Sequence, residues 1–422
     1  LYTIGSIGSI AQSKGSDIDL WICYDESRLT EQQISQLKRK LILIEKWADH
    51  SLKLEVHFFV MGLSDIRNNS FGYSDHESAG SAQAMLLKDE FYRSAILLAG
   101  KKPAYWLFEP DIPSKTYASR LAKLKDNNPA LFAEILDMGN LEPIPKGEYF
   151  GASLWQIVKA MKSPFKSIMK IGLLDAYLSA HSVDHLLSNR LKRNVFNRMR
   201  DLWEIDPYAL LFKEVYTHYR NAKREDVLEL IRLSFLQKTA LSFDPAIEIE
   251  EEHVPMECFF PYSESDIAGH IEPRRGGEKQ VIKKLNTFSE LAAFGDRIVK
   301  FMLSTLLNIQ KQLSQLDIEL PISQSDLTKL GRKITSALAP SDRKIMRLPF
   351  VESVSHFFSA LEISCEGMPG TPKTWYVRGD SPKREGAKSE TAAIRQDKSL
   401  ERLLIWLIAN NLYKPGTHVY AS

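Results

Sequence analysis

The order of strand-like and helix-like patterns along the chain constrains its fold most strongly. Between residue 1 and about residue 110, strand patterns at Ile18–Tyr24 and Leu52–Met61 alternate with helical patterns at Thr30–His50 and Ser81–Ala99. After about residue 115, helical patterns follow one another and strand patterns nearly vanish. This order predicts an α/β domain followed by a mainly α-helical domain, which makes a multi-domain α+β protein overall.

The length of 422 residues exceeds what one hydrophobic core usually supports. We predict an α/β domain over residues 1–112, a helical domain over 113–245, an irregular linker over 246–280 and a helical or mixed region over 281–422. Because the chain starts at Leu1 and is strand-like at once, we expect a fragment whose first domain is truncated at its N-terminus. Helices are expected at Lys115–Asp126, Pro129–Asp137, Leu154–Met161, Pro164–Ser179, Val183–Trp203, Ala209–Tyr219, Glu225–Ser242 and, broken once, Leu285–Leu316.

Composition excludes membrane-spanning, fibrous and disulfide-rich proteins. The 55 Lys and Arg residues balance 53 Asp and Glu residues, so the net charge of +2 gives no reason to expect nucleic acid or an anionic membrane as a partner. Cys23, Cys258 and Cys365 lie far apart, which fits a reducing compartment and no structural zinc. Since no apolar run approaches the length of a transmembrane helix, we expect a cytoplasmic protein.

A Gly/Ser-rich stretch precedes the first long strand and is typical of a phosphate-binding turn. It reads Gly-Ser-Ile-Gly-Ser-Ile from Gly5 onward. Gly5 and Gly8 allow backbone amides to approach a ligand closely, and Ser6 and Ser9 add hydroxyl donors. These residues are therefore candidates for holding phosphate oxygens.

Acidic residues at the start of two strands predict a metal site. Asp17 and Asp19 are two residues apart, so a strand points both carboxylates to one face, where they repel each other unless a cation lies between them. A hard divalent ion such as Mg²⁺ is the natural occupant. Glu55 reaches the same face if the two strands are neighbours, which gives a two-metal arrangement for phosphoryl transfer. His57 shares this parity, but we expect a hydrogen-bonded bystander there.

Four motifs together resemble the class I adenylate cyclases of enterobacteria and their relatives. These motifs are Ser16–Trp21 after the Gly/Ser turn, Glu55–Phe59, Asp89–Arg93, and the octad Glu148–Trp155. Class I adenylate cyclases belong to the polymerase-β-like nucleotidyltransferase superfamily. The resemblance covers about residues 1–245, and it departs from the family pattern at Ala11, Lys14, Gly15 and after the octad, where Ile157-Val158-Lys159 keeps only the lysine.

The resemblance implies a nucleotidyltransferase domain whose ATP cleft is completed by the helical domain. It implies conversion of ATP to 3′,5′-cyclic AMP and pyrophosphate, with Asp17 and Asp19 binding two Mg²⁺ ions (Mn²⁺ as an alternative) and Glu55 completing the ion near the ribose 3′-hydroxyl. It also implies regulation by the glucose phosphotransferase system through a C-terminal region that we do not expect in this chain. The expected ATP-binding residues are Gly5, Ser6, Ser9, Arg93, Lys101, Lys159, Ser163 and Lys166.

Two alternatives stay open at the level of sequence. One is another nucleotidyltransferase that moves AMP to an RNA, a protein or a small molecule; the balanced charge speaks against RNA, and the octad Glu148–Trp155 favours the cyclase. The other is a domain that binds nucleotide without turnover and acts as a sensor. Retention of the three carboxylates at Asp17, Asp19 and Glu55 speaks against this second alternative.

Overall fold

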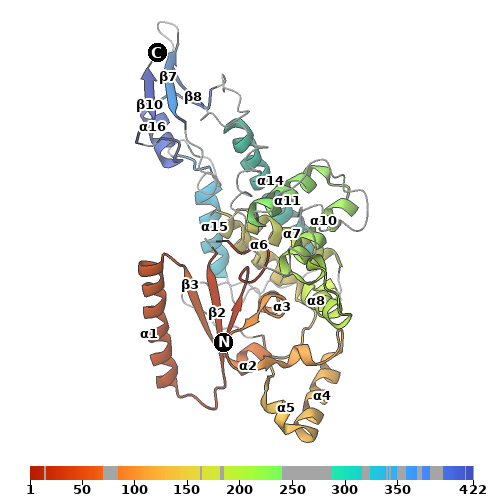
Figure 1. Cartoon of the computed structure of the whole chain (residues 1–422). Coiled ribbons are helices and arrows are strands. Elements are labelled where there is room, and N and C mark those ends of the chain that lie inside the picture. The colour runs from red at the N-terminus through yellow and green to blue at the C-terminus, as the bar shows by residue number, and fades with distance from the viewer. Residues whose placement is uncertain are drawn as a thin grey trace.

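The computed structural model of the chain is a mixed α/β structure in which helices predominate (Figure 1). The expected combination of a strand-containing part and a helical part is confirmed at this level. The predicted linker over 246–280 lies outside the residues that the structure describes. Those residues are 1–13, 16–69, 84–161, 164–180, 185–239, 288–315, 324–338, 341, 344–348, 358–367, 373–380, 393–413 and 415–421.

The N-terminal part contains a four-stranded sheet in the order β3-β2-β1-β4. Strands β2 and β3 are parallel, and β1 pairs antiparallel with both β2 and β4. The pattern at Ile18–Tyr24 predicted β2 with the bounds that the structure shows. The strands of this sheet are β1 (Tyr2–Ile4), β2 (Ile18–Tyr24), β3 (Val56–Gly62) and β4 (Ile96–Leu97).

Two helices flank this sheet. Helix α1 (Glu31–Trp47) begins with a capping box between Thr30 and Gln33 and lies beside β3 at the outer side of the molecule (Figure 1). Helix α3 (Ala84–Ser94) packs on the sheet through Phe91, whose ring stacks on Trp21 at 4.7 Å between centroids. Burial of these aromatic rings anchors α3, and its opposite side remains available to the helical part.

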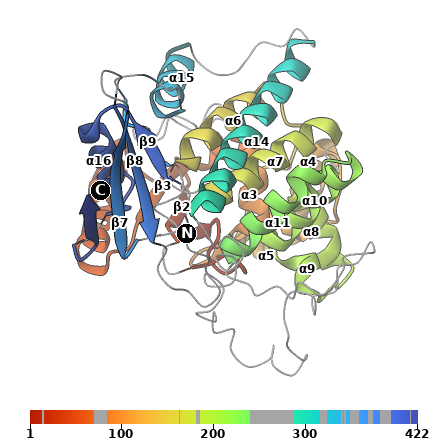
Figure 2. The same ribbon diagram turned by 90° about the horizontal axis from the view of Figure 1, so that it is seen from above.

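The helical part is built around α7 (Pro164–Ala180), which is apolar on most of its circumference. It packs against α6 (Lys146–Ala160), α10 (Pro207–Asn221), α11 (Glu225–Thr239) and α14 (Phe288–Ser314), as Figure 2 shows from above. One hydrophobic core runs from the N-terminal sheet through these helices. The sheet and the helices therefore share buried surface. The remaining helices here are α2 (Leu63–Arg67), α4 (Ser114–Asn127), α5 (Pro129–Ala133), α8 (Leu187–Phe196), α9 (Leu202–Ile205) and α15 (Gln324–Leu338), with η1 (Ala48–Leu52) and η2 (Ala104–Leu107) as π- and 3₁₀-turns.

A second sheet near the C-terminus has its own core. Its order is β10-β7-β8-β9, and α16 (Leu400–Ala409) packs against β8 and β9. Buried Phe358, Leu361, Val377 and Leu403 form this core together with Phe288 at the start of α14. The strands are β7 (Ala360–Glu366), β8 (Thr374–Asp380), β9 (Arg395–Asp397) and β10 (His418–Ala421), and a separate two-stranded ladder joins β5 (Lys102–Pro103) and β6 (Ile135–Leu136).

Several sequence-based boundaries were wrong for identifiable reasons. The predicted helix at Ser81–Ala99 ends at Ser94, because Ile96 and Leu97 pair with β1 as an edge strand. The helix predicted at Pro129–Asp137 ends at Ala133, since Ile135 in β6 pairs with Lys102 in β5. Local helical periodicity cannot anticipate such long-range pairing.

Two further helix predictions were wrong: one predicted helix is divided in the structure, and one predicted break does not occur. The segment Val183–Trp203 was expected as one helix, but α8 ends at Phe196 and a residue with positive φ, Arg198, precedes α9. The stretch Leu285–Leu316 was expected to break once, yet α14 is continuous from Phe288 to Ser314. Packing against α6, α7 and α11 stabilises α14 along its length.

Glu148, the first residue of the octad, links the helical part to the N-terminal part. Its buried carboxylate on α6 accepts hydrogen bonds from the backbone N–H groups of Met85 (3.0 Å) and Leu86 (3.3 Å) at the start of α3. It thus satisfies donors that the first turn of a helix leaves unpaired. Burial raises the pKa of Glu148 to about 7, although these backbone donors act in the opposite direction.

This raised pKa predicts a pH-dependent stability. The folded state binds a proton on Glu148 more tightly than the unfolded state. The stabilisation that this proton gives the folded state is therefore fully present below about pH 4.5 and is lost as the pH rises through 7. The free energy of unfolding of Glu148→Gln, taken relative to that of the parent, should therefore increase by up to about 3 kcal/mol as the pH rises from 5 to 8. Urea unfolding across this range measures the difference, and Glu225→Gln at the exposed start of α11 is the control. A difference between parent and Glu148→Gln that does not change with pH would contradict the assignment.

Candidate active site

The parallel pairing of β2 and β3 brings the predicted acidic residues to one end of the sheet. Asp19 lies opposite His57 in the register, and the Ile18 N–H donates a hydrogen bond to the Glu55 carbonyl at 2.9 Å. Since side chains alternate along each strand, Asp17, Asp19, Glu55 and His57 share one face. The expectation that these two strands are neighbours is confirmed.

The carboxylates of this face have different partners. Lys166 Nζ lies 3.9 Å from Asp17 Oδ1, and His57 Nε2 lies 3.1 Å from Glu55 Oε1. The Glu55 side chain is 63% exposed. Within the part of the chain that the structure describes, no three His, Cys, Asp or Glu side chains come close enough together to hold a metal ion. The metal-binding roles of Asp17, Asp19 and Glu55 stay predictions.

The Gly/Ser turn leaves open space beside Asp19. Gly5 has φ +92°, and a Cβ at this position would lie 3.8 Å from Asp19 Oδ2. The Gly5 N–H donates to Ser94 Oγ at 3.1 Å, so the turn is anchored to the end of α3. Ser6 Oγ donates to Ser16 Oγ at 3.2 Å, and Ser9 Oγ donates to the Ser6 carbonyl at 2.7 Å. Both serine hydroxyls therefore stabilise the turn in this conformation.

Asp206 fastens the turn to the helical part. Its Oδ2 accepts a hydrogen bond from the Ile10 N–H at 2.9 Å, while its Oδ1 accepts from the N–H groups of Tyr208 (2.8 Å) and Ala209 (2.9 Å). One buried carboxylate thus caps α10 and holds a turn that lies 196 residues away in sequence. The position of the turn depends on where α10 begins.

Lysines from the helical part set the charge of the site. Burial acts to raise the pKa of Asp17, but Lys166 and then Lys159 outweigh it, so this pKa lies below its usual value. The pKa of Asp19 is raised, first by burial and then by the charge of Asp17. Lys238 on α11 is close enough to Lys166 and Asp17 to feel their charges, and burial followed by repulsion from Lys166 lowers its pKa to about 8.

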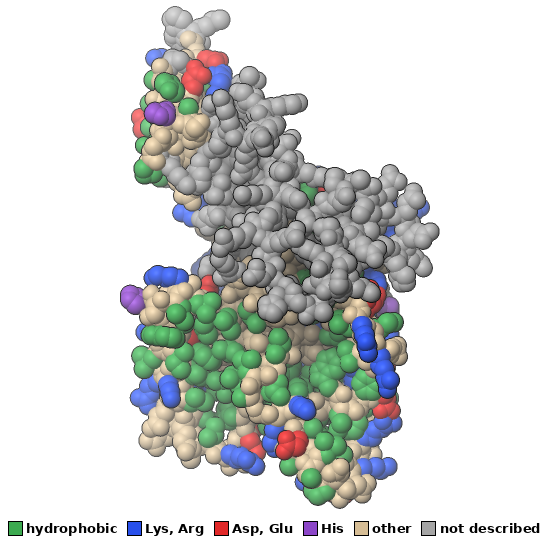
Figure 3. Space-filling view, in the orientation of Figure 1, with side chains coloured by type: hydrophobic (Ala, Val, Ile, Leu, Met, Phe, Trp, Pro, Cys, Tyr) green, Lys and Arg blue, Asp and Glu red, His purple; other side chains and the backbone are tan. Residues whose placement is uncertain are grey.

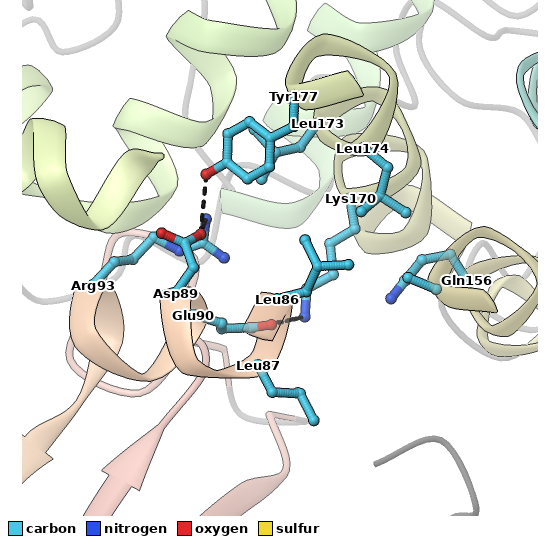
Figure 4. A pocket seen from close by; sticks show the side chains of 11 residues that line it. Leu86, Leu87, Asp89, Glu90, Arg93, Gln156, Lys170, Leu173, Leu174 and Tyr177 are labelled. Atoms are coloured by element: carbon cyan, nitrogen blue, oxygen red, sulfur yellow. Dashed lines mark hydrogen bonds and ion pairs between the residues drawn. The ribbon is translucent and has the colours of Figure 1, made fainter. Parts of the chain in front are cut away.

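A buried ion pair joins α3 to α7 (Figure 4). Lys170 Nζ lies 2.7 and 2.8 Å from the two carboxylate oxygens of Glu90. Burial opposes the charge of Glu90, but Lys170 and Arg93 outweigh it and lower its pKa to about 2; burial lowers the pKa of Lys170 to about 8. The pair lines a cavity of about 40 Å³ that Gln156 and Tyr177 also border.

The structure brings most of the predicted ATP-binding residues toward this region. Arg93 is buried beside Asp89, with Nη1 3.8 Å from Asp89 Oδ2. Lys159 is exposed and lies over the Trp155 ring, 5.6 Å from its centroid. Lys101 is exposed and lies toward the other end of β1, since Tyr2, opposite Trp21, donates to its carbonyl at 2.5 Å. Ser163 lies outside the described residues.

Sequence analysis missed several residues that border the site. Glu90 lies inside the recognised Asp89–Arg93 motif, and Lys170 follows Lys166 at helical spacing, which indicates a shared helix face but no partner. Asp206 precedes Pro207 in a helix-start pattern, which signals a cap but not its second hydrogen bond. For Tyr208 and Lys238 no pattern indicated a role, because only tertiary packing brings α10 and α11 to the sheet.

Comparison with known proteins identifies the family. A model described as "Adenylate cyclase NT domain" matches residues 1–106, and one described as "Adenylate cyclase, class-I, second domain" matches residues 144–349. The chain belongs to the class I adenylate cyclase family. The resemblance of its motifs to this family is thereby confirmed.

Similar proteins from several bacteria carry the name adenylate cyclase. The one from Salmonella typhimurium is 28% identical over 426 residues, which covers 100% of this chain and 48% of the relative. The one from Haemophilus influenzae is 29% identical over 444 residues, which covers 99% of this chain and 49% of the relative. The chain thus spans about half the length of these relatives. No solved structure matches the chain.

The distribution of charged side chains on one face and the apolar character of the helices bear on possible partners. On the face shown in Figure 3, the described Lys and Arg side chains are scattered among hydrophobic and other side chains. Among the described residues, no helix combines the length and the apolar character that crossing a bilayer requires.

The double role of Asp206 can be tested by hydrogen exchange. Asp206→Ser retains a cap for α10 but cannot also reach the Ile10 N–H, so the amides of residues 5–12 should exchange faster while those at the start of α10 stay protected. The lost buried hydrogen bond should reduce the free energy of unfolding by about 1 kcal/mol. Asp201→Ser is the matched control, because Asp201 caps α9 through Trp203 at 3.0 Å. Unchanged exchange at residues 5–12 in Asp206→Ser would contradict this role.

Proposed function

We propose that this chain converts ATP to 3′,5′-cyclic AMP and pyrophosphate. The observation that carries the proposal is the arrangement of Asp17 and Asp19 beside the open Gly5 turn, facing Lys166 from the helical part. The family match over both parts and the names of the relatives support the formation of cyclic AMP as the reaction at this site. The proposal includes a polymerase-β-like nucleotidyltransferase fold for the N-terminal part, with ATP bound between the sheet and the helices.

Two of the predicted donors on the sheet suit a hard divalent cation. Asp17 and Asp19 present carboxylate oxygens on one face, and the missing side chain of Gly5 keeps the space beside Asp19 open. We propose that these residues and Glu55 hold two Mg²⁺ ions or Mn²⁺. Bound in this way, divalent ions supply the charge that acidifies a hydroxyl and neutralises phosphate oxygens.

The protein itself would contribute position and charge. Lys166, which faces Asp17, and Lys159 lie where negative charge of a triphosphate needs compensation, and their fields already lower the pKa of Asp17. The Gly5 turn, held by Ser94 and Asp206, presents its backbone to the phosphates. No covalent intermediate with the protein is needed, so holding the 3′-hydroxyl in line with the α-phosphorus accounts for the catalysis.

Location and regulation are further parts of the proposal. A cytoplasmic location fits a substrate such as ATP and the three widely spaced cysteines. Control by the glucose phosphotransferase system rests on the family resemblance alone, through a C-terminal region of the whole protein.

Product analysis by mass spectrometry tests the reaction. With ATP and Mg²⁺, the chain should form cyclic AMP and pyrophosphate, and an Asp17→Ala, Asp19→Ala double variant should lose at least about 100-fold in rate, since both carboxylates act on charge that develops in the transition state. Asp25→Ala is the control, because this aspartate lies after β2 and bonds to its sequence neighbours Ser27 and Arg28. Chelation of the metal should abolish product formation.

Two outcomes would reject the proposal. Pyrophosphate without cyclic AMP, together with AMP on an added acceptor, would indicate another nucleotidyltransferase. Metal-dependent ATP binding without any product would indicate a nucleotide sensor.

A further inference from the structure

Two buried polar atoms near the candidate site have no hydrogen-bond partner among the described residues. One is the hydroxyl of Tyr208, in the first turn of α10, and the other is Nη1 of Arg93 on α3. Tyr208 is 5% exposed and Arg93 is 8% exposed. Buried polar atoms are nearly always satisfied, so two such atoms in one place indicate a ligand.

The two side chains line one cavity, although they come from opposite parts of the molecule. This cavity, of about 10 Å³, has room for one water-sized atom and is also bordered by Gly5, Ser94 and Lys170. Gly5 also neighbours Asp19, since a Cβ at Gly5 would lie 3.8 Å from Asp19 Oδ2, so the cavity borders the Gly5 turn. We call it the Tyr208 cavity.

The groups around the Tyr208 cavity favour an anion. Both carboxylate oxygens of Glu90 are occupied by Lys170, at 2.7 and 2.8 Å. Ser94 Oγ already donates to the Glu90 carbonyl and accepts from Gly5. The two atoms that lack a hydrogen-bond partner, a phenol hydroxyl and a guanidinium nitrogen that is also 3.8 Å from Asp89 Oδ2, can both donate, and an oxyanion can accept from both.

The position of the cavity selects the kind of anion. The Tyr208 hydroxyl is close enough to Lys166, Glu90, Arg93 and Asp17 for their charges to act on its pKa, which burial raises. It therefore lies beside the group of side chains that we assign to ATP. Asp206 holds the start of α10 and the Gly5 turn together, so the turn and Tyr208 form one unit.

We propose that the Tyr208 cavity binds one oxygen of the phosphates that leave as pyrophosphate, with the Tyr208 hydroxyl donating a hydrogen bond and Arg93 supplying charge. This inference rests on the proposed function, since it names the subsite for the leaving group of that reaction. It assigns the Tyr208 hydroxyl and Nη1 of Arg93 as phosphate-binding groups contributed by different parts of the fold.

Calorimetric titration of the 422-residue chain with inorganic pyrophosphate and Mg²⁺ tests the inference. Tyr208→Phe removes only the hydroxyl, and it should weaken pyrophosphate binding by about tenfold or more, the loss expected for one hydrogen bond to a charged group. Without ligand, this variant should be at least as stable as the parent, because the hydroxyl has no protein partner.

Tyr219→Phe is the matched control on the same helix. Its hydroxyl donates to Asp175 at 2.9 Å, so this variant should lose stability but bind pyrophosphate like the parent. Arg93→Lys, which retains the charge but loses the planar fork, should also weaken binding.

The outcomes separate the subsite from the reaction. Parent-like pyrophosphate binding by Tyr208→Phe would overturn the subsite, even if the parent forms cyclic AMP; the cavity would then hold only water. Binding that depends on Tyr208 in a chain that forms no cyclic AMP would support the phosphate site and reject the proposed reaction.

Discussion

The ion pair between Glu90 on α3 and Lys170 on α7 is the contact on which the geometry of the candidate site depends. One side of α3 is anchored to the sheet by the Phe91–Trp21 stack, and the other side pairs Glu90 with Lys170. Because Lys166 precedes Lys170 by one turn, this pair also sets where Lys166 meets Asp17. Removing one partner of such a buried pair typically costs about 3–5 kcal/mol, since the other charge is left unpaired.

Two further links hold the two parts of the molecule in register. Glu148 binds the first turn of α3, and Asp206 binds the Gly5 turn. Each link places a carboxylate from the helical part against backbone of the sheet part. A substrate bound at this junction would contact both parts, so their relative position determines how phosphates are held.

Much of the fold could be predicted from local patterns. The bounds of β2, the parity of Asp17 and Asp19 and the existence of most helices follow from alternation and helical periodicity. The edge strand at Ile96, the strand at Ile135 and the uninterrupted length of α14 could not be predicted in this way. In each case a partner distant in sequence determines the backbone conformation, and a local window contains no information about that partner.

The sequence by itself determined the family, the carboxylates on β2 and β3, and the Gly5 turn that precedes them. These features are local, since residue type and spacing specify which groups share a strand face and where the backbone can turn tightly. Only the tertiary structure decided that Lys166 faces Asp17, that Asp206 holds Ile10, and that Tyr208 and Arg93 line one cavity. The physical reason is that burial and charge act through space, between segments that lie together only after the helices pack on the sheet.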